Sequence, residues 1–177
     1  YTPVTGTGLT FSSADDASTT ITLPFSFNYC GTSYTTLLVS TNGMVRFGTP
    51  ESRFNAMAST TYTNVIAPFW DDLSSSSVSG HISYYTEGTA PNRTLTIQYS
   101  DVYRLSAATY LLNFQIKLNE TTNVIEFVYG SGFTSYVYSS ATSSIGINSS
   151  RNNSTYYISI TPTGSGTATT STTVAND

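Results

Sequence analysis

Apolar and polar side chains alternate most clearly over residues 110–118. One parity holds Tyr110, Leu112, Phe114, Ile116 and Leu118, and the other holds Leu111, Asn113, Gln115 and Lys117. A period of two is typical of a half-buried strand. The polar run 119–123 (Asn-Glu-Thr-Thr-Asn) supplies turn residues, and apolar residues return over 124–129. These segments predict a hairpin.

A second hairpin is predicted from residues 81–87, through the polar loop 88–92, and back along 93–102. Further strands are predicted at 19–23, 25–29, 36–40, 44–47, 64–69, 144–147 and 156–161. Asn42-Gly43 predicts a chain reversal, because both residue types tolerate positive φ. One short helical turn is expected within 52–60. About ten short strands separated by turns predict an all-β, two-sheet antiparallel β-sandwich of jelly-roll-like form.

The two ends of the chain differ in apolar content. Residues 1–161 are long enough for one sandwich domain with its own core. Residues 162–177 are rich in Ser and Thr and almost free of large apolar side chains. This tail is expected to be a linker, a stalk, or a strand that pairs with another subunit. Because residue 1 is Tyr and no signal peptide is visible, we expect a mature or excised fragment.

Three residues have expected structural roles. Pro68 predicts an edge position or a bulge, because it cannot donate to a strand ladder. Trp70, the only tryptophan, is expected in the core or at its rim. Cys30, the only cysteine, ends a strand-like run and is expected to be a small buried hydrophobe. The alternative for Cys30 is a disulfide to another chain.

Composition narrows the setting of the domain. Charged residues make up 9% of the chain, whereas 28 Ser and 32 Thr fill about a third of it. A neutral surface rich in hydroxyls suits the outside of a cell. The net charge is −4 and the 6 Lys and Arg residues are scattered, so we expect no nucleic-acid partner. No apolar run approaches the ~20 residues of a membrane helix, so no membrane span is expected.

Six segments follow one another in a familiar order. They are residues 23–34, 39–48, 64–73, 80–85, 90–99 and 114–130, and they include Val39-Ser-Thr-Asn-Gly43 and Ala67-Pro-Phe-Trp-Asp-Asp72. This order resembles β-sandwich ectodomains of bacterial surface proteins exported by the type IX pathway. It is similar, more distantly, to the NIDO module of nidogen-like extracellular proteins. The match covers roughly residues 1–147, and it departs at Cys30, where Gly or a small polar residue is expected. The resemblance implies a non-enzymatic extracellular module used in adhesion or matrix assembly.

Candidate chemistry is sparse. His81 is the only histidine, too few for a zinc site, and no nucleophile-elbow motif accompanies it. The carboxylate pairs are Asp15–Asp16 and Asp71–Asp72. Members of one pair point apart in a strand, which does not suit a glycosidase. Asp71 or Asp72 joining Asp15 or Asp16 around calcium is one hypothesis, and turn capping is the commoner explanation. We therefore expect no enzyme activity and no cofactor.

Five Asn-x-Ser/Thr sequons are candidate glycosylation sites: Asn92, Asn119, Asn148, Asn152 and Asn153. Chance alone predicts about four in a chain so rich in Ser and Thr, so their number is uninformative. Asn92 and Asn119 fall in predicted hairpin loops, where a glycan fits. Sugar attached to hydroxyls of the Thr-rich tail is an equally good hypothesis.

Two function hypotheses remain. The first is a structural or adhesive module, either a filament subunit or a repeat of a long adhesin, whose copies join by strand addition. Its partners are other copies or neighbouring domains of the same surface protein. The alternative is a glycan-binding module, with Tyr84 or Tyr85 and Tyr99 and Tyr103 as the contact rings. Tyrosine is also a common half-buried residue of a sandwich face.

Overall fold

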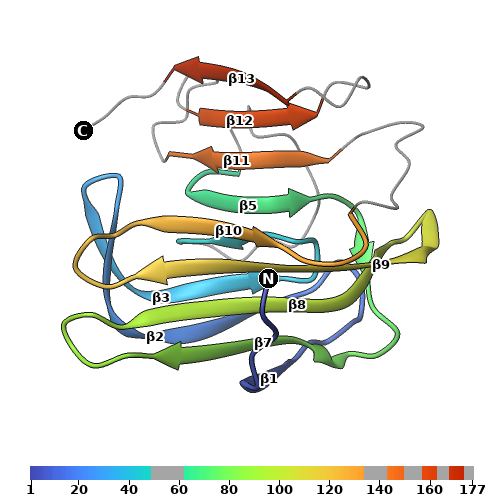
Figure 1. Cartoon of the computed structure of the whole chain (residues 1–177), viewed down its shortest axis with the longest axis horizontal. Helices are drawn as coiled ribbons and strands as arrows, with labels where there is room; N and C mark the ends of the chain where they lie inside the picture. The colour runs from blue at the N-terminus through green and yellow to red at the C-terminus, as the bar shows by residue number, and fades with distance from the viewer. Residues whose placement is uncertain (49–61, 134–142, 150–156, 163–167, 174–177) are drawn as a thin grey trace.

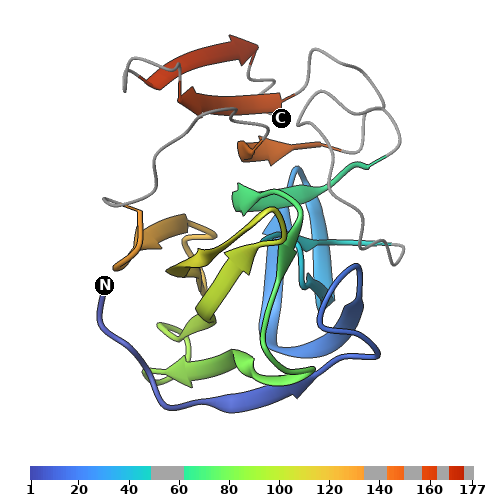
Figure 2. The same ribbon diagram turned by 90° about the vertical axis from the view of Figure 1, so that its right-hand side faces the viewer.

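The computed structural model describes residues 1–48, 62–133, 143–149, 157–162 and 168–173. Within these ranges every regular element is a β-strand, and the strands form two antiparallel sheets (Figure 1 and Figure 2). This confirms the predicted all-β, two-sheet antiparallel fold. The helical turn predicted at 52–60 lies outside the described residues.

Strand order is as follows. The six-stranded sheet runs β1 (Thr7–Thr10), β7 (Ser79–Glu87), β8 (Thr94–Arg104), β9 (Ala107–Asn119) and β10 (Ile125–Tyr129), and β6 (Leu73–Ser74) pairs with the end of β8. The seven-stranded sheet runs β13 (Ala168–Thr173), β12 (Tyr157–Pro162), β11 (Ser144–Asn148), β5 (Val65–Trp70), β4 (Val45–Arg46), β3 (Thr32–Ser40) and β2 (Ser18–Tyr29). Sequence neighbours pair in both sheets, and β5 to β6 is one of the points where the chain changes sheet.

Both predicted hairpins are confirmed. β9 pairs with β10 from Leu118–Ile125 to Phe114–Tyr129, and β7 pairs with β8. The alternation over β9 has the predicted result on one face, because Leu112, Phe114, Ile116 and Leu118 are fully buried. The opposite face is not exposed throughout, because Gln115 on that face is also buried. Residues 1–6 cover it, as described below.

The reversal at Asn42-Gly43 is also confirmed, with a different turn. β3 pairs with β4 through Val39 and Val45, and the Ser40 N–H donates to the Met44 carbonyl at 3.0 Å. Only Gly43 of the predicted pair has positive φ, at 73°. A loop of three residues whose last member is left-handed is a common hairpin solution.

Pro68 lies in an interior strand, because β5 sits between β11 and β4. An edge position for Pro68 is therefore wrong. The bulge alternative is right: the β11–β5 register shifts between Ser144, which faces Trp70, and Gly146, which faces Ala67. The extra residue lies on β5 beside Pro68, where a missing N–H is tolerated.

β2 replaces two predicted strands with one. Its register against β3 shifts between Thr22 and Phe27, on either side of Pro24. The chain thus stays extended through Pro24, and only the ladder is interrupted there, because proline lacks an N–H.

The main core lies between the sheets. It includes the inward side chains of β2 and β3 and those of β8 and β9, among them Phe27, Leu37, Ile97 and Phe114. Trp70 is buried as predicted, but it belongs to a second cluster with Met44, Val65 and Ala67. Alternation before the bulge puts Ile66 in the main core and its two neighbours in the second cluster, and the extra residue at the bulge then brings Phe69 to the main core.

The tail contains a strand that pairs within its own chain. β13 lies inside residues 162–177 and is hydrogen-bonded to β12 along its whole length. The seven-stranded sheet therefore extends beyond the six-stranded one, and β11 to β13 form this extension (Figure 1 and Figure 2). Among the described residues, the structure has no helix long and apolar enough to cross a membrane.

Candidate functional site

Three carboxylates meet at one end of the sandwich. Asp15 and Asp16 lie in the connection between β1 and β2, and Asp72 lies between β5 and β6. One oxygen of each lies within 4.8 Å of the others. The isolated β-bridge between Asp15 and Ser74 joins the β1–β2 connection to β6. The sequence suggested that one aspartate of each pair could meet, and the structure shows that Asp72 meets both Asp15 and Asp16.

Asn42 positions this cluster from the β3–β4 turn. Its amide Nδ2 donates to Asp16 Oδ1 at 2.8 Å, and its Oδ1 accepts the Leu73 N–H at 2.9 Å. Asn42 is fully buried, and its amide side chain links the β1–β2 connection to the start of β6. Sequence reasoning treated Asn42 only as a turn former. Its side-chain role could not be found locally, because both partners are distant in sequence.

The cluster is electrostatically unfavourable when ionised. Burial raises the pKa of Asp72, and the charges of Asp15, Asp16 and Asp71 raise it further. Burial and the charge of Asp16 likewise raise the pKa of Asp15. In the described part of the chain, the buried Oδ1 of Asp15 has no hydrogen-bond partner. Desolvated neighbouring carboxylates of like charge disfavour ionisation.

Asp71 has a separate role. It is 1% exposed, its Oδ2 lies 3.2 Å from Arg104 Nε, and its Oδ1 accepts the Asp72 N–H at 2.8 Å. Asp71 therefore caps the turn as predicted and forms an ion pair with Arg104.

The residues able to hold a hard divalent cation such as calcium, which binds carboxylate oxygens, are Asp15, Asp16 and Asp72.

His81 contacts a serine and a main-chain carbonyl. Its Nδ1 lies 2.9 Å from the Ser100 carbonyl, and its Nε2 lies 2.8 Å from Ser76 Oγ. A carbonyl only accepts, so Nδ1 donates to Ser100, and in the neutral ring Nε2 is then an acceptor for the Ser76 hydroxyl. A serine triad orients its histidine with a carboxylate instead. Absence of enzyme activity stays a prediction.

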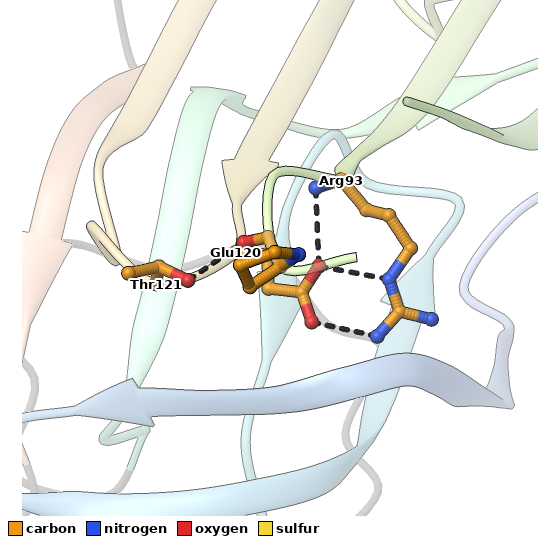
Figure 3. Close-up of polar contacts among 4 residues, drawn as sticks. Arg93, Glu120 and Thr121 are labelled. Atoms are coloured by element: carbon orange, nitrogen blue, oxygen red, sulfur yellow. Dashed lines mark hydrogen bonds and ion pairs between the residues drawn. The ribbon is translucent and has the colours of Figure 1, made fainter. Parts of the chain in front are cut away.

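At the other end of β8, an ion pair and hydrogen bonds join two loops. Arg93 Nε and Nη2 donate to the two Glu120 carboxylate oxygens at 2.8 and 2.6 Å (Figure 3). The Arg93 N–H also donates to Glu120, and Thr121 Oγ1 donates to the Pro91 carbonyl at 2.6 Å. Arg93 lowers the pKa of Glu120 through these bonds. The β7–β8 and β9–β10 loops are thereby joined.

The chain matches the model of a known family over its whole length. A family model described as NIDO related matches residues 1–177. The chain belongs to the NIDO-related family. No curated protein and no solved structure matches it. NIDO-related domains are generally extracellular, which supports the expected extracellular module. Export by the type IX pathway and a bacterial origin stay predictions.

The candidate glycan-contact tyrosines of this NIDO-related chain do not form one surface. Tyr99 is fully buried, and its hydroxyl donates to the Ser40 and Met44 carbonyls at 2.8 and 3.0 Å. The prediction for Tyr99 is therefore wrong, because its side chain lies on the face of β8 that points into the core. Tyr84 packs against the core whereas its neighbour Tyr85 is exposed. Half-buried Tyr103 lies at the far end of β8, bonded to the Ser75 carbonyl. The geometry thus gives the glycan-binding alternative no common platform.

The sequons of the NIDO-related chain differ sharply in accessibility. Asn92 is exposed in the β7–β8 loop. Asn119 is half-buried, and its amide contacts Thr94, Val124 and Glu126. Asn148 is 4% exposed, so its prediction as a glycan acceptor is wrong for the folded chain. Its side chain instead accepts the Val65 N–H and donates to the Tyr62 carbonyl. Asn152 and Asn153 lie outside the described residues.

Cys30 is exposed, which contradicts the prediction of a buried hydrophobe. It has φ 51° and precedes Gly31 with φ 80°, so the two residues form the tight turn between β2 and β3. The strand ends at Tyr29, and Cys30 follows the parity of the exposed Ser26 and Asn28, not that of the buried Phe27 and Tyr29. The sequence signal for this turn is Gly31, because glycine adopts positive φ freely and so favours a turn directly after Tyr29.

Proposed function

We propose that this NIDO-related chain is a non-enzymatic structural or adhesive module of an extracellular surface assembly, as a filament subunit or as a repeat of a long adhesin. Copies join by strand addition, with β13 of one copy pairing with β12 of the next. The place of β13 at the edge of the extended seven-stranded sheet carries this proposal.

The β12–β13 ladder supports an exchange between copies. It runs in register from Tyr157–Thr173 to Pro162–Ala168. β13 reads Ala-Thr-Thr-Ser-Thr-Thr, so it offers little apolar surface and depends on main-chain hydrogen bonds. Those bonds are the same whether β13 comes from its own chain or from another copy, which makes the exchange nearly neutral in free energy.

The topology gives such an assembly a direction. A donor strand on one copy and an acceptor strand on the next form a head-to-tail contact, and a contact of this kind generates open fibres when the rotation does not close. The extension of the sheet beyond its partner sheet keeps the ladder at the periphery (Figure 1). Exchange there leaves the main core between the sheets unchanged.

A disulfide lock tests the proposal. Ser159 and Ser171 are register partners, so Ser159→Cys with Ser171→Cys, in a Cys30→Ser background, ties β13 to its own β12. The matched control is Thr22→Cys with Thr36→Cys, an exposed register pair on β2 and β3. Assembly is followed by light scattering and electron microscopy.

We expect the oxidised β12–β13 lock to form no long polymers and to polymerise after reduction. The oxidised β2–β3 control should polymerise like the parent chain. Equal polymerisation of the locked and reduced chains would refute exchange of β13. A parent chain that stays a single particle at high concentration would refute the assembly itself.

A further inference from the structure

Residues 1–6, called here the strap, cross the outer face of the six-stranded sheet. The strap leaves β1 and passes over β7 and β8 toward β9 (Figure 1). Its main chain bonds to two glutamines. The Val4 N–H donates to Gln98 Oε1 at 2.8 Å, and Gln98 Nε2 donates to the Val4 carbonyl at 3.1 Å. Gln115 Nε2 donates to the Thr2 carbonyl at 2.8 Å. The strap is therefore recognised by its main chain.

The two glutamines form a prepared acceptor. Gln98 and Gln115 are register partners on β8 and β9, and Gln115 Nε2 also donates to Gln98 Oε1 at 2.8 Å. They are 5% and 1% exposed, although they face away from the core. A buried amide that loses its partners carries a desolvation cost. The glutamine pair thus favours an occupied state over an empty one.

The strap itself is bound lightly. Tyr1, Thr2, Pro3 and Thr5 are exposed, and Val4 is only half-buried. At Gly6 the chain runs against β7, where an added Cβ would lie 2.3 Å from the Tyr84 carbonyl oxygen. Because Gly6 has no side chain, the strap can approach β7 this closely. For the same reason, no side chain anchors the strap at this position. A segment with little buried apolar surface opens locally more easily than the core.

These observations together favour exchange. The glutamine pair needs a partner, the strap offers main-chain groups, and every copy of the chain carries the same strap. We infer that the Gln98–Gln115 surface accepts the strap of a second copy in place of its own. This inference deepens the proposed assembly function and rests on it, but it uses the opposite sheet and a different segment. The bonds lost by opening are regained in the exchanged dimer.

A complementation experiment tests the exchange on the full chain. Val4→Pro disables the strap, because proline has no N–H to donate. Gln98→Met disables the acceptor, because it keeps the side-chain length but removes both bonds to Val4. Both variants are built in the Cys30→Ser, Ser159→Cys, Ser171→Cys background and oxidised, so that β13 cannot contribute. Thr5→Pro is the matched control for a proline in the strap.

We expect Val4→Pro alone and Gln98→Met alone to be monomeric, and their 1:1 mixture to contain a heterodimer detectable by native mass spectrometry. The pair should stop at a dimer, since only one working strap and one working acceptor remain. Val4→Pro mixed with Thr5→Pro should also dimerise, because Thr5→Pro keeps both functions. A mixture of Val4→Pro and Gln98→Met that stays monomeric at the highest concentration reached would overturn the inference.

Two features keep the result interpretable. If Gln98→Met does not fold, Gln115→Met takes its place, because it removes the bond to Thr2. A heterodimer with Val4→Pro would again support the inference, and a mixture that stays monomeric would overturn it. Heterodimers in this locked background would establish strap exchange even if β13 exchange fails. Their absence would reject strap exchange without affecting the β13 test.

Discussion

Asp72 shows how a residue acquires an electrostatic cost from its neighbours. Its carboxylate is brought beside Asp15 and Asp16 by the packing of two connections, and its pKa is raised. Asp72→Asn should therefore stabilise the metal-free chain at pH 7, by on the order of 0.5 kcal/mol, or about 1–2 °C in the melting midpoint. Thermal melts in a chelator measure this, with the exposed Glu87→Gln as a control for net charge.

The sign of the pH dependence follows from the direction of the shift. The folded chain binds the Asp72 proton more tightly than the unfolded chain, whose pKa is near 3.8. Ionisation therefore costs stability above the folded pKa, and this cost disappears as the pH falls toward 3.8. The advantage of Asp72→Asn should be full at pH 7 and vanish near pH 3.5 to 4. An advantage that grows on acidification would contradict the assigned cause.

The same melts, repeated with calcium, test the cluster as a cation site. A rise of the wild-type midpoint that Asp72→Asn lacks would show coordination by the cluster. Equal midpoints with calcium and with chelator would exclude it.

Asn92 and Asn148 both lie in Asn-x-Ser/Thr sequons but differ in accessibility. In a host that glycosylates Asn-x-Ser/Thr, Asn92 should carry a glycan, because it is exposed in a loop. Asn148 should carry none in the folded chain, because its amide is buried and bonded to Val65 and Tyr62. Intact mass should fall by one glycan for Asn92→Gln. A glycan found at Asn148 would contradict the structure.

At the scale of elements, two turns with similar dihedral angles carry different constraints. Gly43 has φ 73°, and an added Cβ would lie 2.0 Å from the Phe69 carbonyl oxygen. Gly31 has φ 80° with nothing within 4 Å. Gly31→Ala should cost about 1 kcal/mol from backbone strain alone, whereas Gly43→Ala should cost about 3 kcal/mol or more. Denaturant unfolding measures both, and equal costs would contradict the role of the close approach.

The same comparison explains which elements could be predicted. Alternation located β10 to within one residue and β9 to within three, because burial on one face imposes a period of two. It predicts two strands, 19–23 and 25–29, in place of β2, because a period of two cannot show that the chain stays extended through Pro24 while only the ladder is interrupted. β13 was not recognised as part of the fold, since its Thr-rich sequence has no apolar face and its partner is supplied by β12.

At the scale of the whole molecule, Tyr99 ties the two sheets together. From β8 its hydroxyl donates to the Ser40 and Met44 carbonyls of the β3–β4 hairpin. Tyr99→Phe keeps the ring but leaves two buried carbonyls with one partner fewer, so it should cost about 1–2 kcal/mol. Tyr103→Phe, whose hydroxyl makes a longer bond at 3.3 Å in a half-buried place, should cost less than about 0.5 kcal/mol. Similar losses in denaturant unfolding would contradict the bridging role.

The sequence by itself determined the class of this protein: strands, two principal hairpins, an apolar core and an uncharged, hydroxyl-rich surface. These depend on local periodicity and composition, which are properties of neighbouring residues. Only the tertiary structure decided that Asp72 meets Asp15 and Asp16, that Asn148 and Tyr99 are buried, and that Gln98 and Gln115 bind the strap. Each of these depends on two segments far apart in sequence meeting in space, and alternation along one strand does not specify the element that covers its outer face.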